Sequence, residues 1–489
     1  KSNKMGKNLD RKRTKIVATI SDKNCEPSFL KKLYEAGMDV VRINSAHQTP
    51  EGVTKIVTNV RAVSDKIAIL LDTKGPEIRT TVCDAPLEFL KGQKVTIAGN
   101  AAEKTTASVI NVNYSEIARD VPIGTDILID DGELEIRILG TDGKTLEGRI
   151  ENDGTLGARK TVNIPQVRIN LPSVSERDLI FIDLAVKFDI EFIAHSFVRS
   201  AKDIKAVQKI LDSYKSEIRI IAKIENQQGV DNLDEIMEHS YGIMVARGDL
   251  AIEVPYEKIP GIQRMIIAKC IEKRKPVIVA TQMLHSMISN PRPTRAEVSD
   301  VANAVYSQTD ALMLSGETAA GKYPVESVKT MTRIAHEVEA EKEKYIEMPA
   351  GCLSGEVSSY LAKVAVKTSI RVDAKAIIAD TIKGSAIRDM AAYRGFNPIF
   401  SQCYSIRTMR ELALSYGVVA VYMEKKSSVD EFLYVSLKQL LTTNDLEDSD
   451  IVIVVAGNFS RGTGFSFIEV GTVEYLKGRV SMGDSDLMA

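Results

Sequence analysis

Residues 218–250 read IRIIAKIENQQGVDNLDEIMEHSYGIMVARGDL, and two apolar runs within this stretch decide the fold class. The runs 218–224 and 242–246 are followed directly by charged side chains. A short run that is apolar throughout, rather than at every second position, is typical of a strand buried on both faces. We therefore interpret each run as one inner strand of a parallel sheet.

The same pattern occurs six more times, and helical patterns such as 260–273 and 325–338 separate most of the runs. Eight successive β-then-α units are typical of a (β/α)8 TIM barrel, which usually has about 250 residues. The sequence therefore predicts such a barrel. The six further runs are 14–20, 40–43, 68–72, 192–197, 276–280 and 311–314.

Two parts of the chain depart from this rhythm. After the third run, alternating strands are separated by Asp-Gly pairs ending at Gly132, Gly143 and Gly154, which favour hairpins and predict an inserted small β-barrel domain. Beyond a Pro/Gly/Ser-containing boundary, runs at 376–379, 398–400, 418–422 and 451–455 predict a C-terminal open α/β domain. The expected domains are an N-terminal segment 1–12, a catalytic barrel 13–75 with 167–345, an inserted domain 76–166 and a C-terminal domain 346–489.

Composition excludes several classes of protein. Apolar residues make up 44% and charged residues 27% of 489 residues, as in ordinary globular domains, and the net charge of -2 argues against nucleic-acid binding. No apolar run approaches the roughly 18 residues that span a bilayer, so no membrane association is expected. Five scattered cysteines without a Cys-x-x-Cys pair predict reduced thiols in the cytoplasm.

Polar side chains follow most of the predicted strands, at the end where barrel enzymes place their active sites. Lys223 and Glu225 are two residues apart, so they share one face of their strand. The plain alternative is a structural ion pair. Glu225 with Asp249 would suit Mg²⁺ or Mn²⁺, which takes few carboxylates plus substrate oxygens. Arg42 and Lys223 would supply cations for a phosphate group.

Six segments, in this order and spacing, resemble the signatures of the pyruvate kinase family, and the matching domain plan covers almost the whole chain. The resemblance implies an enzyme of glycolysis that transfers the phosphoryl group of phosphoenolpyruvate to ADP. The segments are Asp72-Thr73-Lys74-Gly75-Pro76-Glu77-Ile78-Arg79, Lys223-Ile224-Glu225-Asn226, residues 242–250, Ala280-Thr281-Gln282-Met283-Leu284, Pro291-Arg292-Pro293-Thr294-Arg295-Ala296-Glu297 and residues 313–319.

The resemblance implies roles for single residues. Arg42 and Lys223 would bind the phosphoryl group, and Thr281 with the Gly248 and Asp249 amides would bind the substrate carboxylate. Mg²⁺ would be held by Glu225 and Asp249, and K⁺ by Asn44, Asp72 and the Thr73 carbonyl. Thr281 and Ser315, at neighbouring strand ends, could relay a proton through water to the enolate, whose donor stays open. The nucleotide contacts would be His47, Arg79 and, in the inserted domain, Lys160.

Some signature residues are interpreted as scaffold instead. Thr294 and Glu297 have the spacing of a helix capping box. Cys270 lies in an amphipathic pattern and is expected to pack in the core.

Two sites depart from the family pattern. Where relatives have a serine ligand for K⁺, this chain has Ala46, and on an extended chain Ser45 would face the opposite way. Because Glu77 is acidic, as in K⁺-dependent relatives, K⁺ is still expected. In the last domain, Lys383, Ser385 and Arg461 lie in altered versions of the loops with which sugar-phosphate-activated relatives bind their effector, so the resemblance implies a possible effector site and leaves its ligand open.

Alternative interpretations remain open at this point. A Mg²⁺-dependent oxo-acid lyase on the same barrel would explain the carboxylates but not the inserted domain. A catalytically silent regulatory homologue is disfavoured by the presence of Lys223, Glu225, Asp249 and Thr281. The resemblance also implies a homotetramer.

Overall fold

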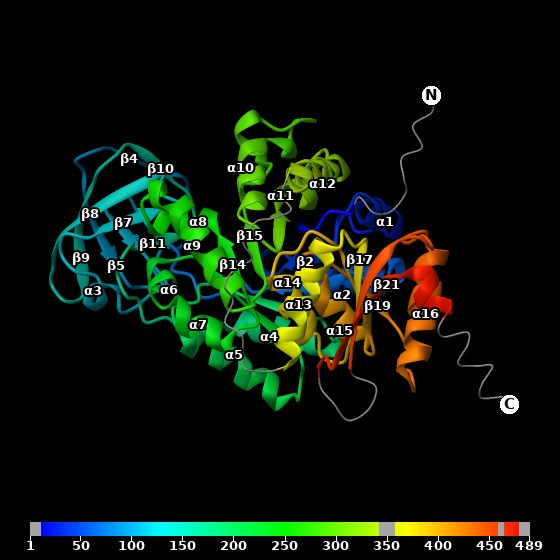
Figure 1. Cartoon of the computed structure of the whole chain (residues 1–489). Helices are drawn as coiled ribbons and strands as arrows, with labels where there is room; N and C mark the ends of the chain where they lie inside the picture. The colour runs from blue at the N-terminus through cyan, green and yellow to red at the C-terminus, as the bar shows by residue number, and fades with distance from the viewer. Residues whose placement is uncertain (1–10, 342–356, 458–463, 479–489) are drawn as a thin grey trace.

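The eight apolar runs form eight parallel strands that close into a barrel in the computed structural model, which describes residues 11–341, 357–457 and 464–478 (Figure 1). The predicted (β/α)8 fold is confirmed. In chain order the barrel strands are β1 (Lys15–Thr19), β2 (Val40–Asn44), β3 (Ala68–Asp72), β12 (Phe192–His195), β13 (Arg219–Ile224), β14 (Gly242–Ala246), β15 (Val277–Ala280) and β16 (Ala311–Leu314).

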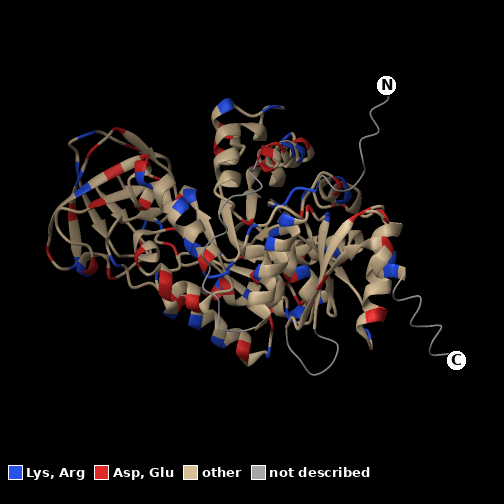
Figure 2. Ribbon diagram, viewed as in Figure 1, with Lys and Arg blue, Asp and Glu red and all other residues tan. Residues whose placement is uncertain are grey.

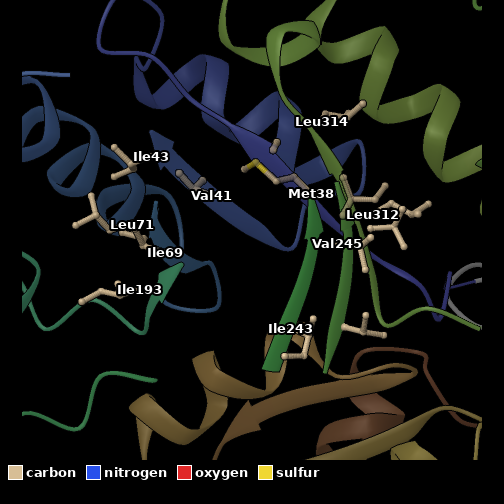
Figure 3. Close-up of a cluster of buried hydrophobic side chains, with 14 of the residues drawn as sticks. Met38, Val41, Ile43, Ile69, Leu71, Ile193, Ile243, Val245, Leu312 and Leu314 are labelled. Atoms are coloured by element: carbon tan, nitrogen blue, oxygen red, sulfur yellow. The ribbon is translucent and has the colours of Figure 1, made fainter. Parts of the chain in front are cut away.

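Alternate residues of each strand point to two separate apolar layers. One set, which includes Ile43, Leu71 and Ile193, packs beneath the surrounding helices (Figure 3). The other set, which includes Leu70 and Ala194, fills the barrel interior. Burying both faces explains why the strands are apolar throughout. The inward-facing Arg42, Asp72 and Lys223 lie within two residues of the carboxyl ends of their strands, beyond the apolar filling.

The barrel helices cover this outer layer, and two of them, α9 and α12, lie where the sequence predicted helices. The predicted capping box at the start of α10 is confirmed, since the Thr294 hydroxyl and the Glu297 carboxylate each accept from the other's backbone amide. The covering helices are α1 (Pro27–Glu35), α2 (Pro50–Val63), α4 (Glu176–Lys187), α5 (Ala201–Ser213), α6 (Gln227–Asp231), α7 (Leu233–His239), α9 (Ile259–Glu272), α10 (Arg295–Tyr306) and α12 (Pro324–Glu341).

The inserted segment forms a separate β-domain at one end of the molecule (Figure 1). Its main sheet has six strands in the order β11-β7-β8-β9-β5-β6, and β4 pairs with β10 in a second, two-stranded sheet. Gly132 and Gly143 have positive φ at the turns between β7, β8 and β9, as their Asp-Gly pairs predicted. The hairpin prediction is wrong for the third pair, because Gly154 begins β10, which pairs with β4 rather than with β9. The strands are β4 (Leu87–Phe89), β5 (Lys94–Ala98), β6 (Val109–Asn111), β7 (Asp126–Ile129), β8 (Leu134–Thr141), β9 (Thr145–Ile150), β10 (Gly154–Leu156) and β11 (Val162–Asn163), with the short helix α3 (Ile117–Asp120) between β6 and β7.

The C-terminal domain is an open sheet at the opposite end, with strand order β19-β18-β17-β20-β21 (Figure 1). Its last strand, β21, is antiparallel to β20 and was not predicted. The Arg394 guanidinium joins this domain to the barrel through two contacts of 2.9 and 2.5 Å with the Asp310 carboxylate. The elements are α13 (Val357–Arg371), β17 (Ala376–Thr381), α14 (Ser385–Ala392), β18 (Ile399–Cys403), α15 (Ile406–Glu411), β19 (Val418–Tyr422), α16 (Val429–Thr442), β20 (Ile451–Ala456) and β21 (Phe467–Thr472).

Acidic and basic side chains are interspersed over all three domains, in keeping with a net charge of -2 (Figure 2). Within the described part of the chain, no helix combines the length and apolarity needed to cross a bilayer.

Candidate active site

Asp72 lies between two cations in the barrel interior, where β2, β3 and β13 end. The Nε and a terminal nitrogen of Arg42 both lie 2.7 Å from Asp72 Oδ2, and Lys223 Nζ lies 3.0 Å from Oδ1. Burial alone would raise the pKa of Asp72, but Arg42 and Lys223 outweigh it and the pKa is lowered. The two cations are therefore held apart by a carboxylate that is ionised at neutral pH.

Lys223 also contacts two groups besides Asp72. Its Nζ lies 2.9 Å from Glu225 Oε1 and donates to Ser196 Oγ at 2.7 Å. Burial opposes its charge, but Asp72 and Glu225 outweigh this and raise the pKa of Lys223, so the ammonium stays charged. Lys223 and Glu225 share one face, as predicted, and they do form an ion pair.

Glu225 and Asp249 carry the features of a divalent-metal pair. Glu225 is 1% exposed, and burial together with the nearby Asp249 charge raises its pKa, although Lys223 partly offsets this. Its Oε1 accepts no well-directed hydrogen bond within the described structure. A buried carboxylate whose pKa is raised by burial and by a neighbouring carboxylate fits a hard divalent cation, which would compete with Lys223 for Glu225 Oε1. No cluster of three or more His, Cys, Asp or Glu in the described ranges could hold a metal, so substrate and water would complete this site.

Thr281 occupies a strained position directly after β15. Its φ is +71°, which is unusual for a β-branched residue, and Arg247 holds its carbonyl at 2.6 Å while pairing with Asp300 at 2.8 Å. The Gly248 amide, in the first turn of α8 (Arg247–Glu253), donates to the Thr281 hydroxyl at 2.8 Å. The predicted carboxylate-binding amide is thus engaged by Thr281, so a bound carboxylate would have to replace that contact.

Ser315 follows β16, which pairs with the strand that leads to Thr281. Its hydroxyl is buried and has no hydrogen-bond partner in the described residues. The two hydroxyls therefore follow adjacent strands, as the proton-relay interpretation requires.

The predicted K⁺ ligands lie at the ends of β2 and β3, which are paired with Asn44 beside Asp72. The expectation of an extended chain after Asn44 is wrong, because residues 45–47 form a 3-10 helix capped by the Asn44 side chain. The Ser45 hydroxyl is buried and without a partner among the described residues. The Thr73 carbonyl accepts from Ser196 Oγ at 2.6 Å.

The structure brings two of the three predicted nucleotide contacts together. Arg79 forms a β-bridge with Thr161, the neighbour of Lys160, and both side chains are ion-paired, Arg79 with Glu77 at 2.7 Å and Lys160 with Asp130 at 2.5 Å. His47 lies on the barrel in the 3-10 helix and is exposed. Charges that pair within the free protein must exchange partners before they bind phosphates.

A cavity of about 600 Å³ lies between the inserted domain and the barrel, and Asp249 is on its wall. The wall also includes Glu77, Asn163 and Glu253, so it combines residues from both domains. A cleft shared by two domains suits a lid that closes over a substrate.

Glu253 in this cleft predicts a pH effect on stability. Burial raises its pKa to about 7, against a smaller opposing effect of the Asn163 hydrogen bond. A raised carboxyl pKa contributes stability that is present at low pH and is lost as pH rises through about 7. The loss begins near pH 4.5, where the unfolded carboxyl ionises, so Glu253→Gln should stabilise the protein only slightly at pH 5 and by about 1–2 kcal/mol more above pH 7.

Thermal unfolding midpoints of the wild type and Glu253→Gln at pH 5 and pH 8 measure this effect. The exposed Glu257 is the matched control, since Glu257→Gln makes the same charge change in water. Parallel pH profiles for wild type and Glu253→Gln would contradict the prediction.

The candidate effector residues are only partly described. Lys383 and Ser385 are exposed at the start of α14, whereas Arg461 lies outside the described residues. The Thr381 hydroxyl accepts from the Gly384 amide at 2.9 Å, which shapes the loop before α14.

Sequence reasoning missed two residues of the site. Ser196 follows the fourth strand and touches Lys223, and Thr19 in the first strand holds Arg42 at 3.0 Å. Both follow the pattern of the other site residues, a polar side chain near a strand end, so the signal that could have found them is present in the sequence.

Comparison with known proteins agrees with this geometry. Residues 11–328 match the family "Pyruvate kinase, barrel domain", and residues 360–468 match "Pyruvate kinase, alpha/beta domain". A pyruvate kinase of Borreliella burgdorferi is 46% identical over 474 residues, 96% of this chain and 99% of its own. One from Sporosarcina psychrophila is 41% identical over 91% of this chain and 78% of its own.

A solved structure supports the same assignment. The crystal structure of a pyruvate kinase from Cryptosporidium parvum superposes with a TM-score of 0.90 at 33% identity, covering 95% of this chain and 97% of that one. Given this likeness along nearly the whole chain and the clustered strand-end residues, the protein belongs to the pyruvate kinase family.

Proposed function

We propose that the protein catalyses the glycolytic transfer of the phosphoryl group of phosphoenolpyruvate to ADP, giving pyruvate and ATP. The observation that carries this proposal is the buried Lys223 ammonium, held 2.7 to 3.0 Å from Ser196, Glu225 and Asp72 at the strand ends. Phosphoryl transfer depends mainly on positioning and on neutralising charge. A fixed, fully charged ammonium in a water-poor site meets both needs.

Arg42 and Lys223 are the groups assigned to the transferring phosphoryl. Both are 8% exposed, and both are oriented by Asp72, so little reorganisation is needed when an anion arrives. As the phosphoryl leaves, Lys223 also stabilises the enolate oxygen that develops.

Glu225 and Asp249 are assigned to Mg²⁺ or Mn²⁺. The bound ion supplies Lewis-acid stabilisation of charge on the phosphoryl and enolate oxygens. The residues' own part is to present two carboxylates, one of them oriented by the Phe197 amide at 2.6 Å.

The substrate carboxylate is assigned to Thr281 with the Gly248 and Asp249 amides. Besides contacting the carboxylate, the Thr281 hydroxyl would take part with Ser315 in carrying a proton through water to the enolate carbon. Neither hydroxyl is acidic enough to act alone, so both position the proton rather than supply it.

ADP is assigned to the interdomain cleft, with His47, Arg79 and Lys160 as its phosphate contacts. Closure of the inserted domain would bring these groups together and exclude water, which otherwise accepts the phosphoryl group.

K⁺ is assigned to Asn44, Asp72 and the Thr73 carbonyl. Glu77 is acidic, although Arg79 and Lys74 lie 2.7 and 3.4 Å from its carboxylate. A monovalent cation would balance the remaining carboxylate charge near the phosphoryl.

Ala46→Ser should shift K⁺ activation to lower K⁺, by about threefold. The serine hydroxyl would replace a bound water, whose immobilisation costs about 0–2 kcal/mol. The measurement is initial rate against K⁺ at fixed ionic strength, with a bulky ammonium salt as replacement. Ala46→Cys, kept reduced, is the control of similar size without an oxygen. Full wild-type activity without K⁺, Na⁺ or NH₄⁺ would contradict the K⁺ assignment.

An assay of the purified protein tests the main proposal. We expect pyruvate to form from phosphoenolpyruvate only when ADP and Mg²⁺ are both present, with ATP in equal amount. Release of pyruvate from other oxo-acids without ADP would support a lyase instead.

We also propose that a phosphorylated effector binds at Lys383, Ser385 and Arg461. Calorimetry with sugar phosphates and nucleotides tests this site, and no binding at millimolar levels would rule it out.

We further propose that the protein is a cytoplasmic homotetramer. Light scattering measures the mass of the assembly in solution and so tests the tetramer.

A further inference from the structure

His195 is a buried histidine beside the active site that none of the assignments above uses. It is the last residue of β12 and is 1% exposed. In the barrel register Ala194 lies beside Asp72, which places His195 next to Thr73 on the neighbouring strand. Ile193 belongs to the layer beneath the helices, so His195, two residues on, faces that layer rather than the substrate.

The Thr73 side chain connects this outer layer to the active site. Its Oγ1 lies 3.4 Å from His195 Nδ1, accepts from the Ser196 amide at 3.0 Å and lies 3.3 Å from the Ala194 carbonyl. When the hydroxyl donates to Ala194, the Nδ1 proton of His195 points at Thr73. When the hydroxyl donates to His195 instead, Nδ1 is the acceptor. In either case the imidazole restrains the Thr73 rotamer.

On the inner side, the same two residues touch the catalytic groups. The Ser196 hydroxyl donates to the Thr73 carbonyl at 2.6 Å and accepts from Lys223 Nζ at 2.7 Å. A continuous set of contacts thus runs from His195 through Thr73 and Ser196 to Lys223 and to the carbonyl assigned to K⁺.

A second anchor holds the same loop from the helix side. Asp178, at the start of α4, accepts from the Lys74 amide at 2.9 Å and the Gly75 amide at 3.4 Å. Gly75 packs so closely on Ser196 that an added Cβ would lie 2.9 Å from the Ser196 Cβ. The loop after β3 is therefore fixed by hydrogen bonds and close packing, so a change in the Thr73 side chain would shift its neighbours.

His195 is suited to a neutral, structural contact rather than to proton transfer. Burial lowers its pKa to about 4, so the imidazole is uncharged near neutral pH. Its Nε2 has no hydrogen-bond partner in the described structure, so Nδ1 is the ring nitrogen that contacts Thr73.

We infer that His195 is a positioning residue for the phosphoryl-transfer site: by restraining Thr73 it sets the direction of the Thr73 carbonyl toward the monovalent cation and of the Ser196 hydroxyl toward Lys223. The inference rests on the proposed function and adds a residue that acts from the outer, helix-facing side of the barrel wall.

His195→Asn and His195→Leu form the matched test pair, because the two side chains have nearly the same shape. Asparagine places an amide nitrogen where Nδ1 lies, whereas leucine offers no polar atom. His195→Leu should raise the K⁺ concentration for half-saturation about threefold to tenfold, the effect of one hydrogen bond, and lower kcat. His195→Asn should stay within about twofold of the wild type on both measures.

Two readouts keep this inference separate from the proposed function. The first is the shift in unfolding midpoint caused by K⁺ in the absence of substrate, at fixed ionic strength with a bulky ammonium salt. The second is kcat and the KM for each substrate, where the KM for ADP should not change. A wild type without activity would overturn the proposed function, while the K⁺ shift would still test His195.

Two outcomes would overturn the inference. One is a folded His195→Leu protein whose K⁺ dependence and kcat equal those of the wild type. The other is equal impairment of the Asn and Leu variants, because shape or burial rather than the Nδ1 contact would then be responsible. Rescue by asparagine alone supports the positioning role.

Discussion

Lys223→Met should reduce kcat by at least about 10²–10³-fold, equivalent to about 3–4 kcal/mol of transition-state stabilisation, with the barrel still folded. Methionine matches the length of the lysine stem but removes the ammonium that contacts Asp72, Glu225 and Ser196. No other described cation contacts Glu225 through an ion pair, so the charge is not replaced locally. Steady-state assays with saturating Mg²⁺ measure the loss.

The same substitution should also lower stability, which provides its control. Removing one partner of a buried ion pair leaves the other carboxylate uncompensated, at a cost of about 3–5 kcal/mol. Asp72 keeps Arg42, so most of this cost falls on Glu225. Adding Glu225→Gln to Lys223→Met should therefore restore part of the unfolding midpoint but none of the activity. A folded Lys223→Met protein with near-normal turnover would disprove the catalytic assignment.

Asp249→Asn should raise the Mg²⁺ requirement at least about tenfold and cut turnover sharply, because one of two charged ligands is lost. Asp249 lies in the first turn of α8, beside the cleft and close enough for its charge to raise the pKa of Glu225. The amide keeps the shape of the carboxylate, so the effect is one of charge. Direct titration with Mn²⁺, followed by electron paramagnetic resonance, measures affinity without relying on activity.

Asp231→Asn is the matched control for this experiment. Asp231 lines the same cleft as Asp249 but is not assigned to the metal site. It should leave Mn²⁺ binding unchanged. An Asp249→Asn protein that binds Mn²⁺ as tightly as the wild type would remove Asp249 from the metal site.

The sequence predicted the positions of the eight barrel strands and many of the residues at their ends. Arg42, Asp72, Lys223 and Glu225 were expected together, and they lie within contact distance. The prediction of an extended chain at Ser45 was wrong because Asn44 caps a 3-10 helix there. Strand β21 was not predicted because Phe467–Thr472 is only partly buried, so its sequence is neither apolar throughout nor regularly alternating.

What the sequence by itself determined is therefore the order and placement of the strands. The pattern that specifies them is local: a run buried on both faces must be apolar, and it ends where polar residues begin. Which polar groups then touch was decided only by the tertiary structure. Ser196 meets Lys223, Thr73 meets His195, and Thr281 takes the Gly248 amide because closing the barrel sets the stagger between strands that are distant in sequence. No local periodicity encodes that stagger, so the contacts that orient the catalytic ammonium appear only in the folded chain.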